Sequence, residues 1–382
     1  MKVILKHNIL KELRESRAIP IEVMPVKLGI SLEDYKKYEI EDIEVDINLA
    51  DKISGIFRRN WSVFLLDGLP KETLVKRDNR TVENKTPSLH EKTIEAVEDA
   101  NYIFEFVRNL STFSGLQIPK YDDVKDLEAE DLGFRLRKQS KISIKDQENF
   151  KDSSDAFKHW RKFVESMGIF VSQYPLNAED KIRAFSVSDH DRAIIVLNTK
   201  DTPAGRTFSL FHELCHILRR NSGICDMHYS MSSDVEVFCN KFAAAFLVPI
   251  EEVNDYINSH GENIILSDID FHSYKLASRL KVSRLVIYRR FATLGIISDS
   301  EYSEVHKRLL KTFTVKPRES KESEDGGSGG PNYYTIRKIR NGEAYSNTVL
   351  EAFNTGEITA FEASNALGVG VSNLDKYRSI TA

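Results

Sequence analysis

The sequence feature that most constrains the fold is a stretch that predicts a helix with two histidines four residues apart. Thr202 and Pro203 place a hydroxyl at the N-cap and a proline at the first helical position, a pattern that favours a helix start. His212 and His216 lie one turn apart in the following GRTFSLFHELCHILRR, so both imidazoles can bind one metal ion. Glu213 lies beside the first histidine, where it can orient and deprotonate a water molecule. This is the arrangement of the His-Glu-x-x-His zinc motif.

A third protein ligand is expected in the segment SSDVEVFCNKFAAAFLVP, residues 232–249. A catalytic zinc ion takes three protein ligands and keeps one position open. Glu236 is the candidate, because the Ala and Phe side chains around it favour a helix packed closely against the first. Asp234 is the competitor, although at a helix start its carboxylate is engaged by free backbone amides. Asn240, one turn after Glu236, is expected either to orient a ligand or to bond with backbone.

Hydrolysis at such a site also needs a donor for the oxyanion of the tetrahedral intermediate. His228 and Tyr229, between the two helices, are candidates for this role, and the alternative is a pair of partly packed loop residues. A peptide substrate could add to the edge of the strand RAFSVS (183–188) by main-chain pairing. For the motif as a whole, the simpler alternative is a buried helix with two incidental histidines. Manganese or iron can also bind two histidines and one carboxylate.

Three cysteines, Cys215, Cys225 and Cys239, lie in or near this region. Cys215 is on a different helical face from the two histidines, and Cys239 lies among Phe and Ala. We expect both to be small core residues rather than ligands, whereas the role of Cys225 in an expected loop stays open. An odd number of cysteines in a long chain argues against a disulfide framework, so a reducing, cytoplasmic location is expected.

The remaining pattern predicts an α+β fold whose core is mainly helical and zincin-like. A helix is expected over residues 153–167. Three short β-prone runs follow it, IFVSQY (169–174), IRAFSVS (182–188) and AIIVLN (193–198). The tight connection between the last two runs favours a small antiparallel sheet.

Stretches poor in apolar residues divide the chain into parts. Residues 67–88 nearly lack apolar side chains, and TVKPRESKESEDGGSGGPN (314–332) is charged and rich in Gly and Ser, as flexible linkers are. We therefore expect a helix-turn-helix-like module at 1–70, a linker and connecting helix at 71–150, a zinc metallopeptidase domain at 151–313, a flexible linker at 314–331 and a helical C-terminal tail at 332–382.

The N-terminal module has the outline of a helix-turn-helix, with a glycine turn between two short helices. Lys36 and Lys37 are its candidate DNA contacts. Residues 1–70 carry 11 basic and 12 acidic side chains, however, and a DNA-binding surface needs an excess of basic ones. A protein-docking module, or a degenerate one that has lost DNA binding, is therefore the favoured interpretation. The more basic stretch 276–295 is expected to pack as helices with a solvated basic face.

Composition excludes few functions. A content of 41% hydrophobic and 29% charged residues is that of an ordinary globular protein. The formal charge of −4 gives no general attraction to nucleic acid or anionic lipid. No apolar run approaches the roughly 18 residues of a transmembrane helix, and the N-terminus lacks the apolar stretch of a signal peptide. No membrane association is expected.

HELCH followed by EVFCNKFAAAFLVP resembles the ImmA/IrrE family of metallo-endopeptidases, which carry His-Glu-x-x-His and a downstream Glu-x-x-x-Asn/Asp block ending in Pro. SGICD (222–226), VLNTKDTPAGRTF (196–208) and parts of both terminal regions extend the similarity. The resemblance implies that His212, His216 and Glu236 bind zinc. It further implies that Glu213 is the general base and that the activity is cleavage of a regulatory protein, often a repressor.

Two other functions stay open at the level of sequence. One is a transcriptional regulator or antitoxin-like protein that binds DNA or a partner and retains the peptidase fold without needing proteolysis. An intact Glu213 counts against this, because a purely structural zinc site has no use for that carboxylate. The other is metal-dependent hydrolysis of a non-peptide substrate, which the motif does not distinguish from proteolysis.

Overall fold

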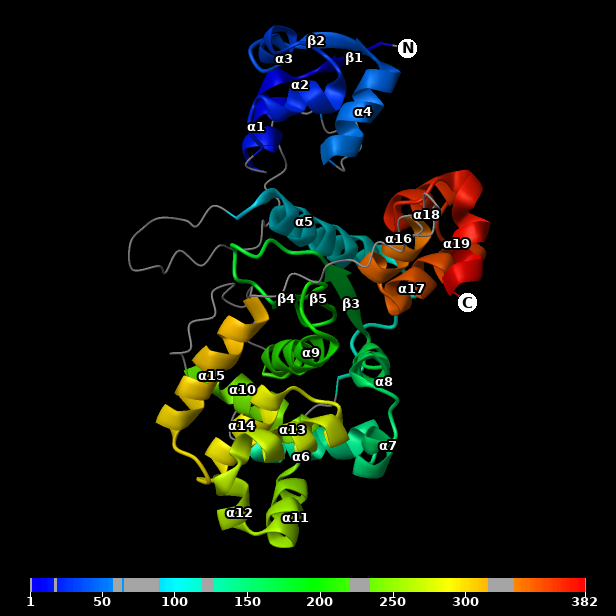
Figure 1. The fold of residues 1–382 in the computed structure, drawn as a ribbon. Coiled ribbons are helices and arrows are strands. Elements are labelled where there is room, and N and C mark those ends of the chain that lie inside the picture. Colours follow the sequence, from blue (N-terminus) through cyan, green and yellow to red (C-terminus); the bar gives the residue numbers. More distant parts are fainter. Residues whose placement is uncertain are drawn as a thin grey trace, which may run out of the picture. The chain divides into compact units, whose positions relative to one another are not determined.

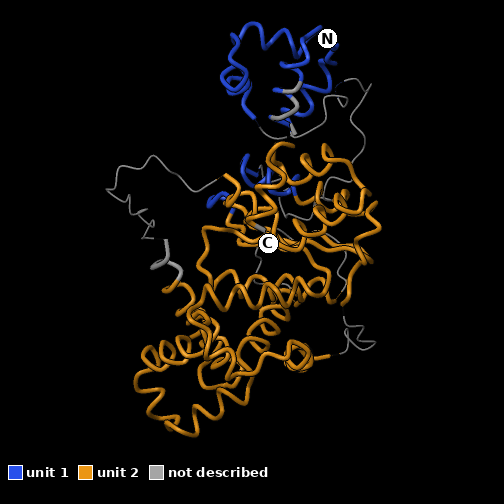
Figure 2. The backbone as a smooth tube through the Cα atoms, turned by 90° about the vertical axis from the view of Figure 1, so that its right-hand side faces the viewer, with its two compact units in different colours: residues 1–99, 177–180 blue, residues 100–176, 181–382 orange. Residues whose placement is uncertain are grey.

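The computed structural model describes residues 2–16, 19–57, 64, 89–118, 127–219, 234–314 and 333–381. These fall into two compact units (Figure 2). Unit 1 comprises residues 1–99 with 177–180, and unit 2 comprises residues 100–176 with 181–382. The predicted linker at 67–88 and nearly all of the one at 314–331 lie outside the described residues.

Unit 1 begins with a small mixed module rather than helices alone. Its strands β1 and β2 pair antiparallel with Val3 opposite Val45. The expected helix-glycine-helix outline is present, because Gly29 ends α2 at a φ of 74° and the Ser31 hydroxyl caps α3. Each strand has only four residues, too few for a clear alternating pattern in the sequence. The elements are β1 (Lys2–Leu5), α1 (His7–Ser16), α2 (Val23–Leu28), α3 (Leu32–Tyr38), β2 (Ile43–Asp46) and α4 (Ile47–Phe57).

A long helix, α5 (Glu91–Phe106), continues into the short 3-10 turn η2 (Val107–Asn109), as the apolar spacing over 89–117 predicts. The start of α5 is held by Asp180. The Asp180 carboxylate accepts hydrogen bonds from the backbone N–H of His90 and from the hydroxyl of Thr93. A helix N-terminus favours such a carboxylate, because its first amides have no partner within the helix.

Unit 2 contains a three-stranded sheet in the order β3-β5-β4, made by β3 (Ile169–Tyr174), β4 (Ala184–Ser188) and β5 (Ala193–Asn198) (Figure 1). The predicted α+β class is confirmed. The hairpin of β4 and β5 is antiparallel, as expected, but β3 pairs in parallel with β5. The sheet is mixed because the chain leaves β3, crosses to the far side for β4 and returns in the middle as β5.

Helices cover this sheet and supply most of the core. The central helix α9 (Pro203–Leu218) contacts β4 and β5 and packs between α8 (Ser153–Glu165) and α10 (Asp234–Leu247). Helix α6 (Ala129–Ser140) lies against α10, so the core extends upstream of residue 151. Phe211 of α9 stacks on Phe246 of α10 with ring centroids 3.9 Å apart. These contacts bring α9 and α10 close together.

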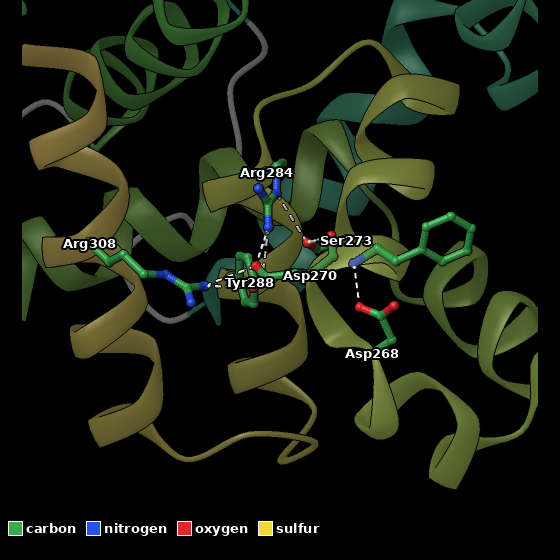
Figure 3. A network of polar contacts seen from close by, with 7 residues as sticks. Asp268, Asp270, Ser273, Arg284, Tyr288 and Arg308 are labelled. Atoms are coloured by element: carbon green, nitrogen blue, oxygen red, sulfur yellow. Dashed lines mark hydrogen bonds and ion pairs between the residues drawn. The ribbon is translucent and has the colours of Figure 1, made fainter. Parts of the chain in front are cut away.

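Further helices pack against this core. They are α7 (Ile144–Glu148), α11 (Ile250–His260), α12 (Glu262–Ser267), α13 (Ile269–Leu280), α14 (Arg284–Thr293) and α15 (Asp299–Thr314). They pack mainly through the contact of α14 with α10. The basic stretch 276–295 forms parts of α13 and α14, and its arginines have local partners. Arg284 binds Asp270, a carboxylate that Arg308 of α15 also binds (Figure 3). Arg290 is buried and binds Glu130 through two nitrogens at 2.6 and 2.5 Å. This arrangement favours packing over DNA contact for the stretch.

The C-terminal tail is part of unit 2 and packs on strand β3. Its elements are α16 (Tyr333–Asn341), α17 (Glu343–Asn354), α18 (Ala360–Leu367), η3 (Val371–Asn373) and α19 (Leu374–Thr381). Gly342 (φ 80°) lies so close to the Val171 carbonyl that a Cβ atom would collide with it. Tyr345 packs edge-on against Phe170, with ring centroids 5.8 Å apart. The tail thus covers the outer edge of β3. No described helix is both long and apolar enough to span a membrane.

Candidate metal centre

The first half of the site is built by α9, whose start follows the pattern expected from the sequence. Pro203 occupies the first turn, and the Thr202 hydroxyl accepts a hydrogen bond from the Gly205 N–H at 3.1 Å. The helix is almost wholly buried beyond its first turn. His212 and His216 therefore project from one face of a rigid, enclosed helix.

Helix α10 brings Glu236 to the same point. Glu236 Oε2 lies 3.1 Å from His212 Nε2, and Glu236 Oε1 lies 3.2 Å from His216 Nε2. The two Nε2 atoms are 3.2 Å apart. All three side chains are buried, and within the described residues they form the one cluster of His, Cys, Asp or Glu suited to a metal ion. Asp234, the competing ligand, begins α10 and does not belong to this cluster.

These distances fit a single bound zinc ion. Zinc binds imidazole nitrogen and carboxylate oxygen at about 2.0–2.2 Å in tetrahedral geometry, which places any two ligand atoms about 3.3 Å apart. The separations of 3.1 to 3.2 Å match that value. A metal ion between these three buried donor atoms would account for their close approach.

The charge state of Glu236 also suits a metal ligand. Burial by itself would raise the pKa of the Glu236 carboxyl, but its close contacts with the His212 and His216 rings outweigh burial and lower this pKa to about 2. The carboxylate is therefore ionised at any pH near neutrality. An ionised carboxylate beside two imidazoles gives the mixed O and N donor set that zinc accepts.

Asn240, one turn after Glu236 on α10, contacts His212 at the ring nitrogen that does not face Glu236. Its side-chain oxygen lies 3.1 Å from His212 Nδ1. With Nδ1–H donating to this oxygen, Nε2 keeps its lone pair free for a metal. The amide thus fixes both the tautomer and the ring orientation of His212.

Glu213 does not join the ligand cluster. It is buried, and its Oε2 accepts a hydrogen bond from the Ser186 hydroxyl of β4 at 2.7 Å. Sequence reasoning missed Ser186, because no spacing rule links a strand residue to a helix 27 positions later. The contact ties the carboxylate to the strand that lies across the sheet from β3.

The two described cysteines are not part of the ligand cluster. Cys215 and Cys239 are fully buried and unoxidised. The pKa of the Cys239 thiol is raised by a hydrogen bond with Cys215 and by burial. Both cysteines are small core residues, as expected.

The other predicted site residues lie elsewhere. His228, Tyr229 and Cys225 fall outside the described residues. Lys36 and Lys37 are exposed on α3 in unit 1, where Lys37 lies 3.5 Å from Asp34. The structure therefore brings together His212, Glu213, His216, Glu236 and Asn240 out of the set derived from the sequence.

A His-Glu-x-x-His helix whose Glu213 is not a ligand, together with a third ligand, Glu236, from the next helix, defines a metallopeptidase-type centre. Comparison with known proteins points to a family. Residues 164–292 match the family model of the IrrE N-terminal-like domain, which supports a metallopeptidase domain of the ImmA/IrrE type in this part of the chain.

One curated relative is the radiation response metalloprotease IrrE of Deinococcus deserti, which is 28% identical over 101 residues, covering 25% of this chain and 34% of that protein. The chain thus matches about a third of the length of that relative. No solved structure matches the chain.

Proposed function

We propose that this protein is a zinc-dependent endopeptidase that cleaves a specific regulatory protein. The observation that carries the proposal is the juxtaposition of a three-ligand metal cluster with Glu213, a buried carboxylate that is not a ligand. A structural metal site has no need of such a group, whereas peptide hydrolysis needs a base. The family and its relative support a metalloprotease; the choice of zinc rests on the donor set and the spacing of its atoms.

The roles of the residues follow from their positions. His212, His216 and Glu236 would hold zinc, which when bound lowers the pKa of a water molecule and polarises a carbonyl. Glu213 takes the proton from the attacking water and delivers it to the leaving amine. The Ser186 hydroxyl holds the Glu213 carboxylate in one orientation while leaving its other oxygen free for that transfer.

The substrate is proposed to bind along β4. This strand is the edge of the described sheet that lies nearest α9, whereas the opposite edge, β3, is covered by the C-terminal tail. An extended peptide can add to a free edge by main-chain hydrogen bonds, which places its carbonyl groups in register with the strand. Because Ser186 binds Glu213, a peptide on β4 passes directly by the proposed base.

A regulatory protein is the proposed substrate, and a cytoplasmic location is proposed with it. The family resemblance supports selective cleavage over general digestion. The second candidate, a DNA- or partner-binding regulator without proteolysis, draws on the helix-glycine-helix outline of α2 and α3. The balance of basic and acidic residues in that module disfavours DNA.

Paired variants test the function. Purified protein should contain about one zinc per chain, and Glu236→Ala should lose both metal and activity, whereas Glu213→Gln should keep the metal and lose turnover. The wild type and Glu213→Gln are then co-expressed with proteins encoded nearby in the genome. A neighbour cut only by the wild type supports the proposal. If no neighbour is cut and promoter DNA is bound equally by both forms, the regulator function replaces it.

A further inference from the structure

The C-terminal tail contains a second helix-turn-helix outline, which has no part in the mechanism above. Helix α18 begins with a capping box formed by Thr359 and Glu362, and it ends at Gly368, whose φ of 64° is left-handed. Residues 368–370 form the turn, and η3 and α19 follow it as one helical segment, residues 371–381. Two helices joined by a short turn with glycine are the framework of DNA-binding helix-turn-helix modules. The buried apolar side chains of the motif are Ala363, Leu367, Val369, Leu374 and Tyr377.

The second helical segment leaves one face open to solvent. Helices α16 and α17 make the main contacts of the tail with β3, whereas α19 packs on α16, α17 and η3 at the outer side of the tail (Figure 1). Ser372, Lys376 and Ser379 follow one another at helical spacing and are all exposed, so they lie on one face. Asp375 is exposed beside them. In helix-turn-helix modules the second helix lies in the major groove of DNA.

Helix α16 places an arginine and a tyrosine at the turn of this motif. The Tyr333 hydroxyl donates a hydrogen bond to the Gly368 carbonyl oxygen at 2.6 Å, and Arg337 Nε donates one to the Tyr333 hydroxyl at 3.1 Å. Arg337 Nη1 lies 2.9 Å from the position that a Cβ atom on Gly368 would occupy. The guanidinium and the phenol therefore lie directly against the turn.

Two lysines continue this basic surface along the second helical segment. Lys376, on α19, holds its Nζ 4.8 Å from the centroid of the Tyr334 ring on α16. Lys338, on α16, donates a hydrogen bond from its Nζ to the Ile380 carbonyl oxygen at 2.6 Å, near the end of α19. Basic groups thus lie at the turn, in the middle and at the end of the motif's second helical segment.

The tail carries five basic and five acidic side chains, but most of the acidic ones are engaged. Glu343 lies 3.8 Å from Arg161 on α8, and Glu357 accepts a hydrogen bond from the Thr112 backbone N–H at 3.2 Å. Glu362 completes the capping box of α18. The other two acidic side chains, both exposed, are Glu351 and Asp375.

The three basic side chains beside the motif are not neutralised by carboxylates. Within the described residues, Arg337, Lys338 and Lys376 contact hydroxyl, carbonyl and ring groups and form no ion pair. The surface along the second helical segment is therefore locally positive, although the tail as a whole is neutral. DNA phosphates are bound mainly by lysine and arginine, with tyrosine and serine hydroxyls adding contacts. A local basic surface of this kind is complementary in charge to DNA.

We propose that the exposed face of residues 371–381 binds double-stranded DNA, with α16 beside it on the phosphate backbone. Ser372 and Lys376 would reach base edges in the major groove, where Asp375 can accept a hydrogen bond from a cytosine amino group. Arg337 and Lys338 would bind phosphates at the side of the groove. The inference goes beyond the proposed peptidase activity and does not depend on it.

Fluorescence anisotropy with a random pool of short duplex DNA tests the proposal on the full-length protein. The affinity is measured over a series of salt concentrations, because each phosphate contact contributes about 0.9 to the slope of log K against log salt. Arg337→Ala and Lys338→Ala should each reduce the magnitude of that slope by about one. The double variant Arg337→Glu, Lys376→Glu should weaken binding by about tenfold or more at low salt.

Two matched double variants control for charge and for the other helix-turn-helix outline. Arg135→Glu, Lys138→Glu carries the same charge change at exposed sites of α6, and it should bind DNA as the wild type does. Lys36→Glu, Lys37→Glu makes the same change on α3 of unit 1 and should also leave the affinity and the slope unchanged. Melting curves establish that each variant is folded. The single alanine variants keep the test decisive if a double variant does not fold.

Failure of the wild type to bind the pool at low salt overturns the proposal, as does an unchanged salt slope in both alanine variants. Loss of DNA binding in Lys36→Glu, Lys37→Glu, with binding retained in the tail variant, also overturns it, because the DNA would then bind unit 1. A partner protein that is lost in the tail variant while DNA is not would reassign this face to protein docking. Glu213→Gln should bind DNA with wild-type affinity, so a failure of the proposed peptidase activity and a failure of DNA binding are separate results.

Discussion

At the scale of single residues, the hydrogen bond from Ser186 to Glu213 ties the proposed base to the substrate strand. Ser186→Ala should keep its zinc and fold but lower kcat by about tenfold or more, because a hydrogen bond to a charged group is worth about 1.5–3 kcal/mol. Metal content and steady-state cleavage give the readout. Ser172→Ala is the matched control, since Ser172 is buried on β3 with no hydrogen bond from its hydroxyl. Equal activity in both variants would remove Ser186 from the mechanism.

Asn240 acts through a different partner, His212. We expect Asn240→Ala to weaken zinc binding by about 10- to 100-fold, because partners of metal ligands fix ring orientation and tautomer. Competition with a chromophoric chelator measures the affinity. Asn240→Asp, which retains an acceptor oxygen, should restore most of it. An unchanged affinity in the alanine variant would show that His212 needs no such support.

The sequence predicted the side chains that the structure brings together at the candidate metal site, because these residues obey helix periodicity. His212 and His216 are linked by one turn of α9, and Asn240 follows Glu236 by one turn of α10. Ser186 obeys no such rule, since its contact joins a strand to a distant helix. A contact of this kind depends on how α9 packs on the sheet, which local patterns do not encode.

At the scale of elements, the packing of α6 on α10 sets the position of Glu236. Gly133 on α6 faces α10 so closely that a Cβ atom would lie 3.0 Å from both the Ala245 Cβ and the Phe246 N. Gly133→Ala should therefore destabilise the protein by roughly 1–3 kcal/mol through overpacking, although alanine is the better helix former. Chemical denaturation measures the change. Gln139→Ala, at an exposed site of the same helix, should leave the free energy of unfolding unchanged or raise it. A rise in the free energy of unfolding in Gly133→Ala would contradict the proposed close packing of α6 on α10.

The strands and helices also show which features of the fold could not be predicted from the sequence. The runs at 169–174 and 193–198 match β3 and β5 in full, because buried β-branched and aromatic residues favour strands. Their parallel pairing was not predicted, since it depends on a crossing connection rather than on the runs themselves. Helix α6 was missed as an element of the core because charged residues dominate its sequence, AEDLGFRLRKQS.

At the scale of the whole chain, docking of the C-terminal tail involves a buried carboxyl group. Glu165, at the end of α8, lies 3.2 Å from Arg161 and accepts a hydrogen bond from the Ala344 N–H of α17. Burial raises the pKa of the Glu165 carboxyl to about 7, outweighing the effect of Arg161. In the unfolded chain the same group titrates near 4.5. The folded state thus binds this proton more tightly.

Stability should therefore fall as the pH rises from about 4.5 to about 7, by at most about 3 kcal/mol from this group. Below 4.5 both states are protonated and above 7 both are ionised, so the contribution is constant outside that window. Urea denaturation at a series of pH values measures the slope. Glu165→Gln should flatten it, whereas Glu351→Gln, on an exposed site of α17, should not. An unchanged slope in Glu165→Gln would assign the effect to other groups.

The collision of any side chain at position 342 with Val171 has a consequence for how the protein behaves at high concentration. A sheet with two bare edges can add copies of itself without end, which is a common start of aggregation. Here the C-terminal tail covers β3, so a strand from another molecule can pair with the described sheet only at β4. Addition therefore stops after one strand. Chains cut at residue 314 or carrying Gly342→Val should then form growing oligomers in light scattering, while the intact protein stays dispersed. Growth of oligomers by the intact protein as well would show that the tail is not what prevents it.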